Sequence, residues 1–233
     1  MKNQVIVIAA LVVLAIPALC AAIPARPGPY VSGFLGVSLP RDTDVTSSDL
    51  SNNNLPNNVP FNDRVEFDPG LSIGGTGGYD FGFLRLEGEL SYKYAEIAAI
   101  TEDTGYRFRN VNGNLGALAM MFNAFFDLHN DSPITPYCGG GIGFATLYLS
   151  NTFGIDTRDG VTNRVLLYPR DDTTVFAYQA GAGLEIAIHR KLSMDLGYRY
   201  FGTAKGTFDK DTTRNVDLKF ESHNATLGVR VKF

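Results

Sequence analysis

Tryptophan is absent from this chain of 233 residues, histidine occurs three times, and cysteine occurs only as Cys20 and Cys138. So few cysteines exclude a small secreted scaffold held together by several disulfides. A formal net charge of −4 provides no basic excess, and a nucleic-acid partner is therefore not expected. Beyond the N-terminal region, no apolar run is long enough for a transmembrane helix.

The N-terminal region has the pattern of an export signal. It opens with a lysine and the apolar run "VIVIAALVVLAI", followed by Pro17 and the small residues "ALCAA". A cationic start, a short apolar run and small residues are typical of a signal peptide. We expect residues 1–22 to be removed by cleavage after Ala22, which leaves residues 23–233 as a barrel domain. An uncleaved membrane anchor is the alternative, and Pro17 and the small residues argue against it.

Strict alternation of apolar and polar residues is the main pattern in the rest of the chain. In "LRLEGELSYKY", Leu84 to Tyr94, the even positions are apolar except for Gly88, and the odd positions are polar or charged. This period predicts a strand with one apolar and one polar face. Comparable patterns mark eight segments: Tyr30–Leu39, Leu71–Tyr79, Phe83–Tyr94, Gly113–Asp127, Ile134–Tyr148, Val175–Ile188, Leu192–Tyr200 and Val216–Phe233.

The connections between these segments alternate in length. "DFG", "LHNDSP" and "HRK" are short, whereas the connections between them span Pro40–Gly70, Ala95–Asn112, Leu149–Thr174 and Phe201–Asn215. An even number of strands with alternating short and long connections is typical of an outer-membrane barrel. We predict an all-β fold, an eight-stranded antiparallel up-and-down transmembrane β-barrel with short periplasmic turns and long extracellular loops. A soluble β-sandwich is the alternative, because it can show the same alternation.

The facing pattern predicts that the apolar rows contact lipid. Aromatic residues fall at outward strand ends, where the interfacial girdles of a barrel lie: Tyr79, Tyr94, Tyr148, Tyr178, Tyr200 and Phe233. On strand five, Gly139, Gly141 and Gly143 share a face with Tyr137, and we expect this small face to admit bulky side chains such as arginine.

The opposite rows bring charges into the lumen. We expect a polar network of Arg85, Glu87, Glu89, Lys93, Glu185, Asp195, Arg199 and Arg230. Buried ions must be paired, because an unpaired ion costs several kcal/mol. An eight-stranded barrel holds little beyond its own side chains, so we predict a plugged, salt-bridged lumen. A small-solute porin that uses these charges as a filter is the alternative.

Few other residues suggest a catalytic site or a metal site. Ser222 lies beside His223, a pair that suggests a lipid-modifying hydrolase as a further alternative. Adjacent strand residues point to opposite faces, however, so the two should not share a hydrogen bond. We therefore expect no enzyme activity, no metal and no cofactor.

Several segments resemble a known family of barrels. "YVSGFLGVS", "PYCGGGIG", "YQAGAGLE", "LSMDLGYRYFG" and "HNATLGVRVKF" are similar to outer-membrane β-barrel proteins of the opacity-porin, OmpA-like transmembrane type. The resemblance extends from about Pro29 to Phe233. It implies a Gram-negative outer-membrane location and a last strand that is read by the outer-membrane assembly machinery. The positions that match this signal are Leu227, Val229, Val231 and Phe233.

The long loops are where we expect function. "SSDLSNNNLPNNVPFND" is rich in Asn, Asp and Ser, and such a segment cannot bury enough apolar surface to fold alone. "FGIDTRDGVTNRVLLYP", Phe153 to Pro169, is the one loop in which we expect a short hairpin. The sequence predicts a monomeric, structural surface protein in contact with outer-membrane lipid, whose loops adhere to a host or cell-surface ligand.

Overall fold

The computed structural model describes residues 27–49, 61–102, 104–128, 132–156, 163–208 and 214–233. The expected signal peptide, residues 1–22, and its cleavage site lie outside these ranges. Among the described residues, no helix is long and apolar enough to cross a membrane.

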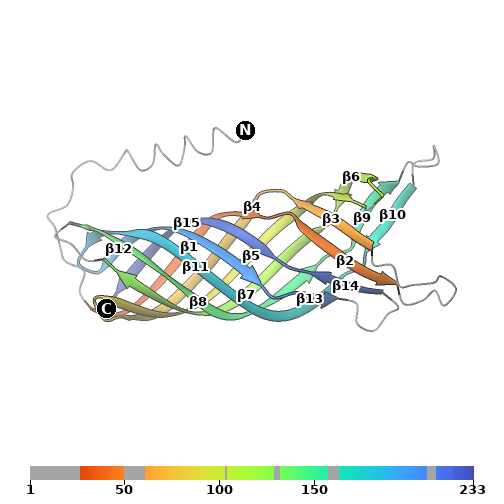
Figure 1. The fold of residues 1–233 in the computed structure, drawn as a ribbon. Coiled ribbons are helices and arrows are strands. Elements are labelled where there is room, and N and C mark those ends of the chain that lie inside the picture. The colour runs from red at the N-terminus through yellow and green to blue at the C-terminus, as the bar shows by residue number, and fades with distance from the viewer. Residues whose placement is uncertain (1–26, 50–60, 103, 129–131, 157–162, 209–213) are drawn as a thin grey trace.

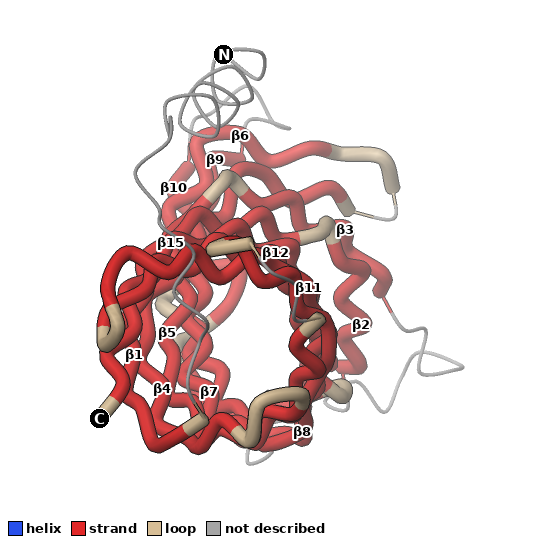
Figure 2. The backbone as a smooth tube through the Cα atoms, turned by 90° about the vertical axis from the view of Figure 1, so that its left-hand side faces the viewer, coloured by secondary structure: helices blue, strands red, loops and turns tan. Residues whose placement is uncertain are grey.

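Eight strands of the described chain close into a ring. Each pairs antiparallel with its neighbours, and the last closes on the first with Leu227 opposite Leu35. Figure 2 shows this ring seen along the barrel. The ring confirms the predicted barrel, and its strands are β1 Gly28–Pro40, β4 Gly70–Asp80, β5 Leu84–Thr101, β7 Asn114–Asp127, β8 Ile134–Leu149, β11 Asp171–His189, β12 Leu192–Thr203 and β15 Glu221–Lys232.

The other seven described strands extend the barrel at the end opposite the C-terminus (Figure 1). Together with the end of β5 they pair in the order β13-β14-β2-β3-β5-β6-β9-β10, and we call this sheet the outer tier. Its short strands are β2 Thr43–Asp49, β3 Phe61–Phe67, β6 Arg107–Asn112, β9 Thr152–Asp156, β10 Asn163–Tyr168, β13 Gly206–Phe208 and β14 Arg214–Leu218.

The outer tier contains strands from both ends of the Pro40–Gly70 connection, which we expected not to fold alone. Within Pro40–Gly70, β2 and β3 pair with each other, and β3 also pairs with β5, so these segments are ordered by their neighbours rather than by their own apolar content. The centre of that connection, residues 50–60, lies outside the described residues. The hairpin expected in Phe153–Pro169 is confirmed by the antiparallel pairing of β9 with β10.

The eighth predicted strand, Val216–Phe233, is two strands in the structure. β14 pairs with β2 in the outer tier, whereas β15 pairs with β1 and β12 in the barrel. The break lies at Phe220, whose backbone N–H donates to the Thr203 hydroxyl at 3.0 Å. The alternation of "VDLKFESHN" runs across this break, which is why the sequence does not reveal it.

The two faces of the barrel wall differ as predicted. On β7, Met120 is 70% exposed and Asn123 is fully buried. The same division holds on β5, where Leu90 is exposed while Glu87 and Glu89 are buried. The apolar residues therefore coat the outside of the ring and the charges lie within it, the opposite of a soluble sandwich.

Candidate functional site

Glu185 is the centre of an ion-pair cluster in the half of the lumen near the C-terminus. Its carboxylate accepts a hydrogen bond from Arg230, lies 3.1 Å from Lys232 Nζ and 3.5 Å from Arg85 Nη1. The Ser193 hydroxyl donates to the same carboxylate at 2.8 Å. All five side chains are buried, and three cations share this one acid.

Three further ionic residues, Asp80, Asp127 and Lys232, belong to this cluster but were not included in the predicted network. Asp80 accepts from Lys232 at 2.9 Å, and Asp127 lies 3.1 Å from Arg85 Nε. All three lie at strand ends. The buried ionic side chains along the described barrel strands are Arg85, Lys93, Arg230 and Lys232 with Asp80, Glu87, Glu89, Asp127, Glu185 and Asp195. The Arg199 side chain beside them is 12% exposed.

A second layer lies above this cluster, around Arg199. The guanidinium donates to Glu89, and its Nη2 is 3.7 Å from Glu87. Asn123 donates to both carboxylates, at 3.3 Å to Glu87 and 3.0 Å to Glu89, and Gln179 donates to Glu89 at 2.9 Å. The amides thus complete the coordination of two adjacent acids that share one cation.

Two buried tyrosines donate hydrogen bonds to acids of these two groups. The Tyr30 hydroxyl donates to Glu87 at 2.5 Å, and the Tyr137 hydroxyl donates to Asp195 at 2.7 Å. Asp195 also accepts from Arg230 at 2.9 Å. Every carboxylate of the predicted network accepts at least one hydrogen bond, which is the condition under which buried acids are tolerated.

Lys93 differs from the other predicted residues because it is not paired with an acid. Its Nζ donates to Ser91 at 3.0 Å and lies 4.1 Å from the centre of the Phe201 ring. No carboxylate among the described residues lies within ion-pair distance of it. Lys93 therefore lies in the lumen as the facing pattern predicts, but without a direct ion pair, and it marks the end of the ionic region.

The glycine face of β8 is small for a reason that differs from our expectation. A Cβ on Gly141 would lie 1.9 Å from Asn123 Oδ1, and a Cβ on Gly183 of β11 would lie 2.4 Å from the Tyr137 hydroxyl. The glycines thus make room for an amide and a phenol of the second layer, rather than for arginine.

The half of the lumen beneath the outer tier is apolar, which the sequence analysis missed. Leu115 and Leu147 of the barrel are buried there against outer-tier residues such as Val45 and Val65. Phenylalanines complete the cluster, namely Phe108, Phe201, Phe208 and Phe220. Both faces of β7 are apolar along "LGALAMMF", so the pattern does not distinguish a lipid-facing wall from an apolar interior.

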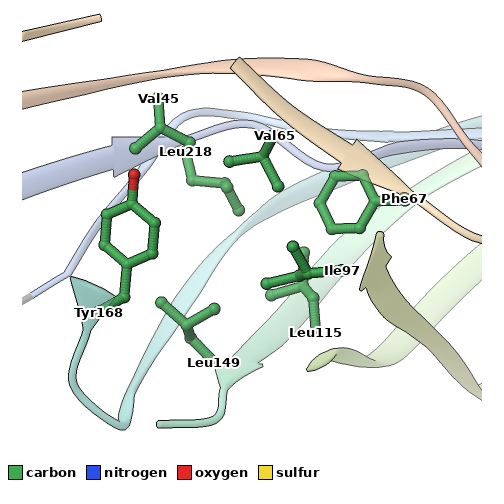
Figure 3. Close-up of a pocket in the computed structure, with 8 residues that line it drawn as sticks. All are labelled: Val45, Val65, Phe67, Ile97, Leu115, Leu149, Tyr168 and Leu218. Carbon is green, nitrogen blue, oxygen red and sulfur yellow. The ribbon is translucent and has the colours of Figure 1, made fainter. Parts of the chain in front are cut away.

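A small cavity of about 10 Å³ remains inside this core, room for about one water molecule. Figure 3 shows its lining, which comes from seven different strands: Val45, Val65, Phe67, Ile97, Leu115, Leu149, Tyr168 and Leu218. The Tyr168 hydroxyl donates to Asp63 at 2.7 Å and so links β10 to β3 across the tier. Packing in this apolar core therefore holds the outer tier against the barrel.

The bond from Tyr168 to Asp63 gives a prediction for the outer tier. Burial, and then the Asp63 carboxylate, raise the pKa of the Tyr168 hydroxyl above its ordinary value of 10.0. The folded chain keeps this proton where the unfolded chain loses it, so the contribution to stability is complete below pH 10.0 and falls as the pH rises further. Tyr168→Phe should cost about 1.5–3 kcal/mol and make that fall shallower.

Amide exchange of β2 and β3, measured on both sides of pH 10, tests this prediction. Tyr148→Phe is the matched control, because Tyr148 is exposed on the outer wall. Equal exchange rates in the wild type and in Tyr168→Phe would contradict the role given to this bond.

The structure separates Ser222 from His223, as the strand period predicts. Ser222 is buried on the inner face, and Asn224 donates to its hydroxyl at 3.1 Å. His223 lies on the outer face, with its Nδ1 2.6 Å from the Tyr198 hydroxyl. The pair therefore cannot act together as a nucleophile and its base.

The last strand presents an exposed apolar row on the outside of the ring. Its members are the residues expected to form an assembly signal, Leu227, Val229, Val231 and Phe233. Their role in assembly stays a prediction.

A closed eight-stranded ring with an apolar outer wall and ion pairs inside defines an outer-membrane β-barrel. The chain belongs to the family described as outer membrane protein beta-barrel domain, whose model matches residues 6–233. It is similar to outer membrane protein PagN of Salmonella typhimurium, with 26% identity over 90% of this chain and 91% of PagN. The protein is therefore located in the outer membrane.

Two further similarities agree with this assignment. The opacity protein opA60 of Neisseria gonorrhoeae is 25% identical over 67% of this chain and 76% of its own length. Among solved structures, the outer membrane protein OprG of Pseudomonas aeruginosa aligns with a TM-score of 0.55 and 12% identity. That alignment covers 90% of this chain and 98% of OprG, and it supports the fold alone.

Proposed function

We propose that this protein is a non-conducting outer-membrane surface protein that binds a ligand outside the cell through its outer tier. The observation that carries the proposal is the filled lumen, ionic in one half and apolar in the other. A charged path alone could pass hydrated ions, but the apolar core beneath the tier places Leu115, Leu147 and Phe201 across it. Water and ions would have to enter a packed hydrocarbon interior at a high free-energy cost.

Planar-bilayer recording of the refolded, full-length protein tests the closed lumen. We expect no steady conductance above that of the lipid alone, because the apolar core blocks the outer end. As a positive control, replacing Leu115 and Leu147 together with serine should produce measurable leak if the barrel stays folded. Stable channels in the wild-type protein would favour the small-solute porin instead.

The binding role of the outer tier is supported by its order and its exposure. Its strands carry exposed ionic side chains such as Arg64 and Arg107, which pair with Asp42 and Glu66 on the surface. Such pairs add little stability and leave polar groups available to a ligand.

Adhesion of non-adherent bacteria that express the full-length protein tests this role. Cells with the wild-type chain should bind to epithelial monolayers more strongly than cells with a chain whose β9–β10 and β2–β3 hairpins are replaced by short turns. Surface display of both chains is checked by heat-modifiable gel mobility. Equal adhesion of the two strains at equal display would contradict the role of the tier.

A further inference from the structure

The outside of the wall has a pocket where β6 leaves β5. The two strands pair at Ile100 with Phe108, and the next rung toward the membrane joins Glu96 to Asn114 at the start of β7. Between these rungs β5 advances four residues while the facing chain advances six, so the facing chain bulges away. The pocket, which we call the wall pocket, has a volume of about 320 Å³, and small-molecule sites are commonly about 300–1,000 Å³.

The backbone of Asn110 gives the bulge its shape. Its φ of 53° is left-handed, and it is the one non-glycine residue with a positive φ among the residues that the structure describes. Asparagine adopts this conformation more readily than most other residues. On its other side β6 pairs with β9, and the register shifts between Arg109 and Asn112. The bulge is therefore held by β9 on one side, and the wall pocket lies on the β5 side.

Polar side chains from three segments of the chain line the wall pocket. The side chains of Asp68, Asn110 and Asn112 make no hydrogen bond or ion pair with another described residue, so their polar groups are available to a ligand. Together the lining provides two carboxylates, three amides and one phenol. These six side chains are Asp68, Tyr94, Glu96, Asn110, Asn112 and Asn114.

The wall pocket lies at the level of the membrane surface. Tyr94 is on the outward row of β5 and is one of the aromatic residues expected in the interfacial girdle. Glu96 is the next outward residue and is exposed. Two residues of a tilted strand rise by only about 5 Å, so the carboxylate of Glu96 reaches the headgroup region of the outer leaflet. In a Gram-negative outer membrane the headgroups of this leaflet are saccharides.

These groups suit the hydroxyl groups of a sugar. Carboxylate and amide oxygens accept hydrogen bonds from hydroxyl groups, and amide N–H groups donate to hydroxyl and ring oxygens. The ring of Tyr94 offers an apolar surface to the C–H face of a pyranose. A phosphate or sulfate group fits less well, because the carboxylates of Asp68 and Glu96 repel it. Arg107 of β6 is already paired on the surface, and the side chain of Arg109 lies outside the described residues, so recognition depends on hydrogen bonding rather than on net charge.

We propose that the wall pocket binds an uncharged pyranose unit of a saccharide. Asp68, Glu96 and Asn112 form hydrogen bonds with its hydroxyl groups, and the Tyr94 ring covers its apolar face. The unit belongs either to the saccharide headgroup of an outer-leaflet lipid or to a free sugar, because both present the same hydroxyl groups. The site goes beyond the proposed surface function, since it requires neither the closed lumen nor adhesion by the outer tier.

The test uses the full-length protein in detergent micelles and the methyl pyranosides of galactose, glucose and mannose as probes. At least one of the three should shift the NMR signal of the Asn110 side-chain amide saturably, with a dissociation constant of about 1–10 mM. Asp68→Ala combined with Asn112→Ala should weaken this binding by about tenfold or more. Asp44→Ala combined with Asn163→Ala is the matched control, because it removes the same types of exposed side chain elsewhere on the outer tier, and it should bind as the wild type does.

Two nanodisc preparations distinguish the two sources of the sugar. With lipopolysaccharide in the nanodisc, a lipid-borne sugar shifts the Asn110 signal from the start, and the Asp68→Ala, Asn112→Ala variant abolishes the shift. With phosphatidylcholine alone, the signal moves only when free pyranoside is added. No shift in micelles or in either nanodisc would overturn the proposal, as would equal binding by the double variant and the wild type. Tighter binding of galactose 6-phosphate than of the galactoside would indicate an anion site instead. None of these outcomes bears on the proposed surface function.

Discussion

Replacing Glu185 with glutamine is expected to destabilise the barrel by about 3–5 kcal/mol. The substitution keeps the shape of the side chain and removes the charge that Arg85, Arg230 and Lys232 share. Each of these cations retains one other carboxylate, Asp127, Asp195 or Asp80, so the loss comes from three weakened charge-assisted contacts rather than from a cation left alone. The loss should appear as a lower urea midpoint in lipid vesicles and as earlier heat modification on gels.

Glu96→Gln is the matched control for this prediction. Glu96 is exposed at the outer end of β5, and its loss should change stability by less than about 0.5 kcal/mol. If Glu185→Gln were as stable as this control, the ion cluster would not hold the lower half of the barrel together.

Leu90→Arg is expected to cost about 2–4 kcal/mol, because it places a charge near the middle of the lipid-facing wall. Leu90 is 53% exposed on β5 and lies between Gly75 of β4 and Met120 of β7. The free energy of unfolding in lipid vesicles measures the effect. In detergent, where water reaches the wall more easily, the loss should be smaller.

The depth dependence provides the control for Leu90→Arg. Leu86 lies four residues before Leu90 on the same strand, nearer the short turns and opposite Tyr79. Leu86→Arg should therefore cost less, toward about 1 kcal/mol. A larger loss at Leu86 than at Leu90 would contradict this placement of the chain in the membrane.

The barrel could be predicted from the sequence because its wall has one apolar face and one polar face. On β5 the inward Arg85, Glu87 and Glu89 alternate with outward leucines, and a slip of one residue would put charges into lipid. The three short connections then predict that the segments they join are neighbouring antiparallel strands. On β7, Met120 faces lipid and Asn123 faces the lumen, although most of that strand is apolar on both faces.

The interior beneath the outer tier could not be predicted in the same way. Leu115 and Leu147 point inward, but they look like lipid-facing residues because nothing local distinguishes one hydrocarbon environment from another. Their partners Val45 and Val65 come from a distant connection that is rich in polar residues. Only the pairing of β3 with β5 brings these valines over the lumen, and that pairing has no sequence signature.

The two halves of the lumen are filled by different kinds of side chain. The ionic half near Glu185 lies toward the short turns, whereas the half around Leu115 lies beneath the outer tier. The two halves should therefore respond to different substitutions. A change of charge acts near the short turns, and a change of side-chain volume acts beneath the tier.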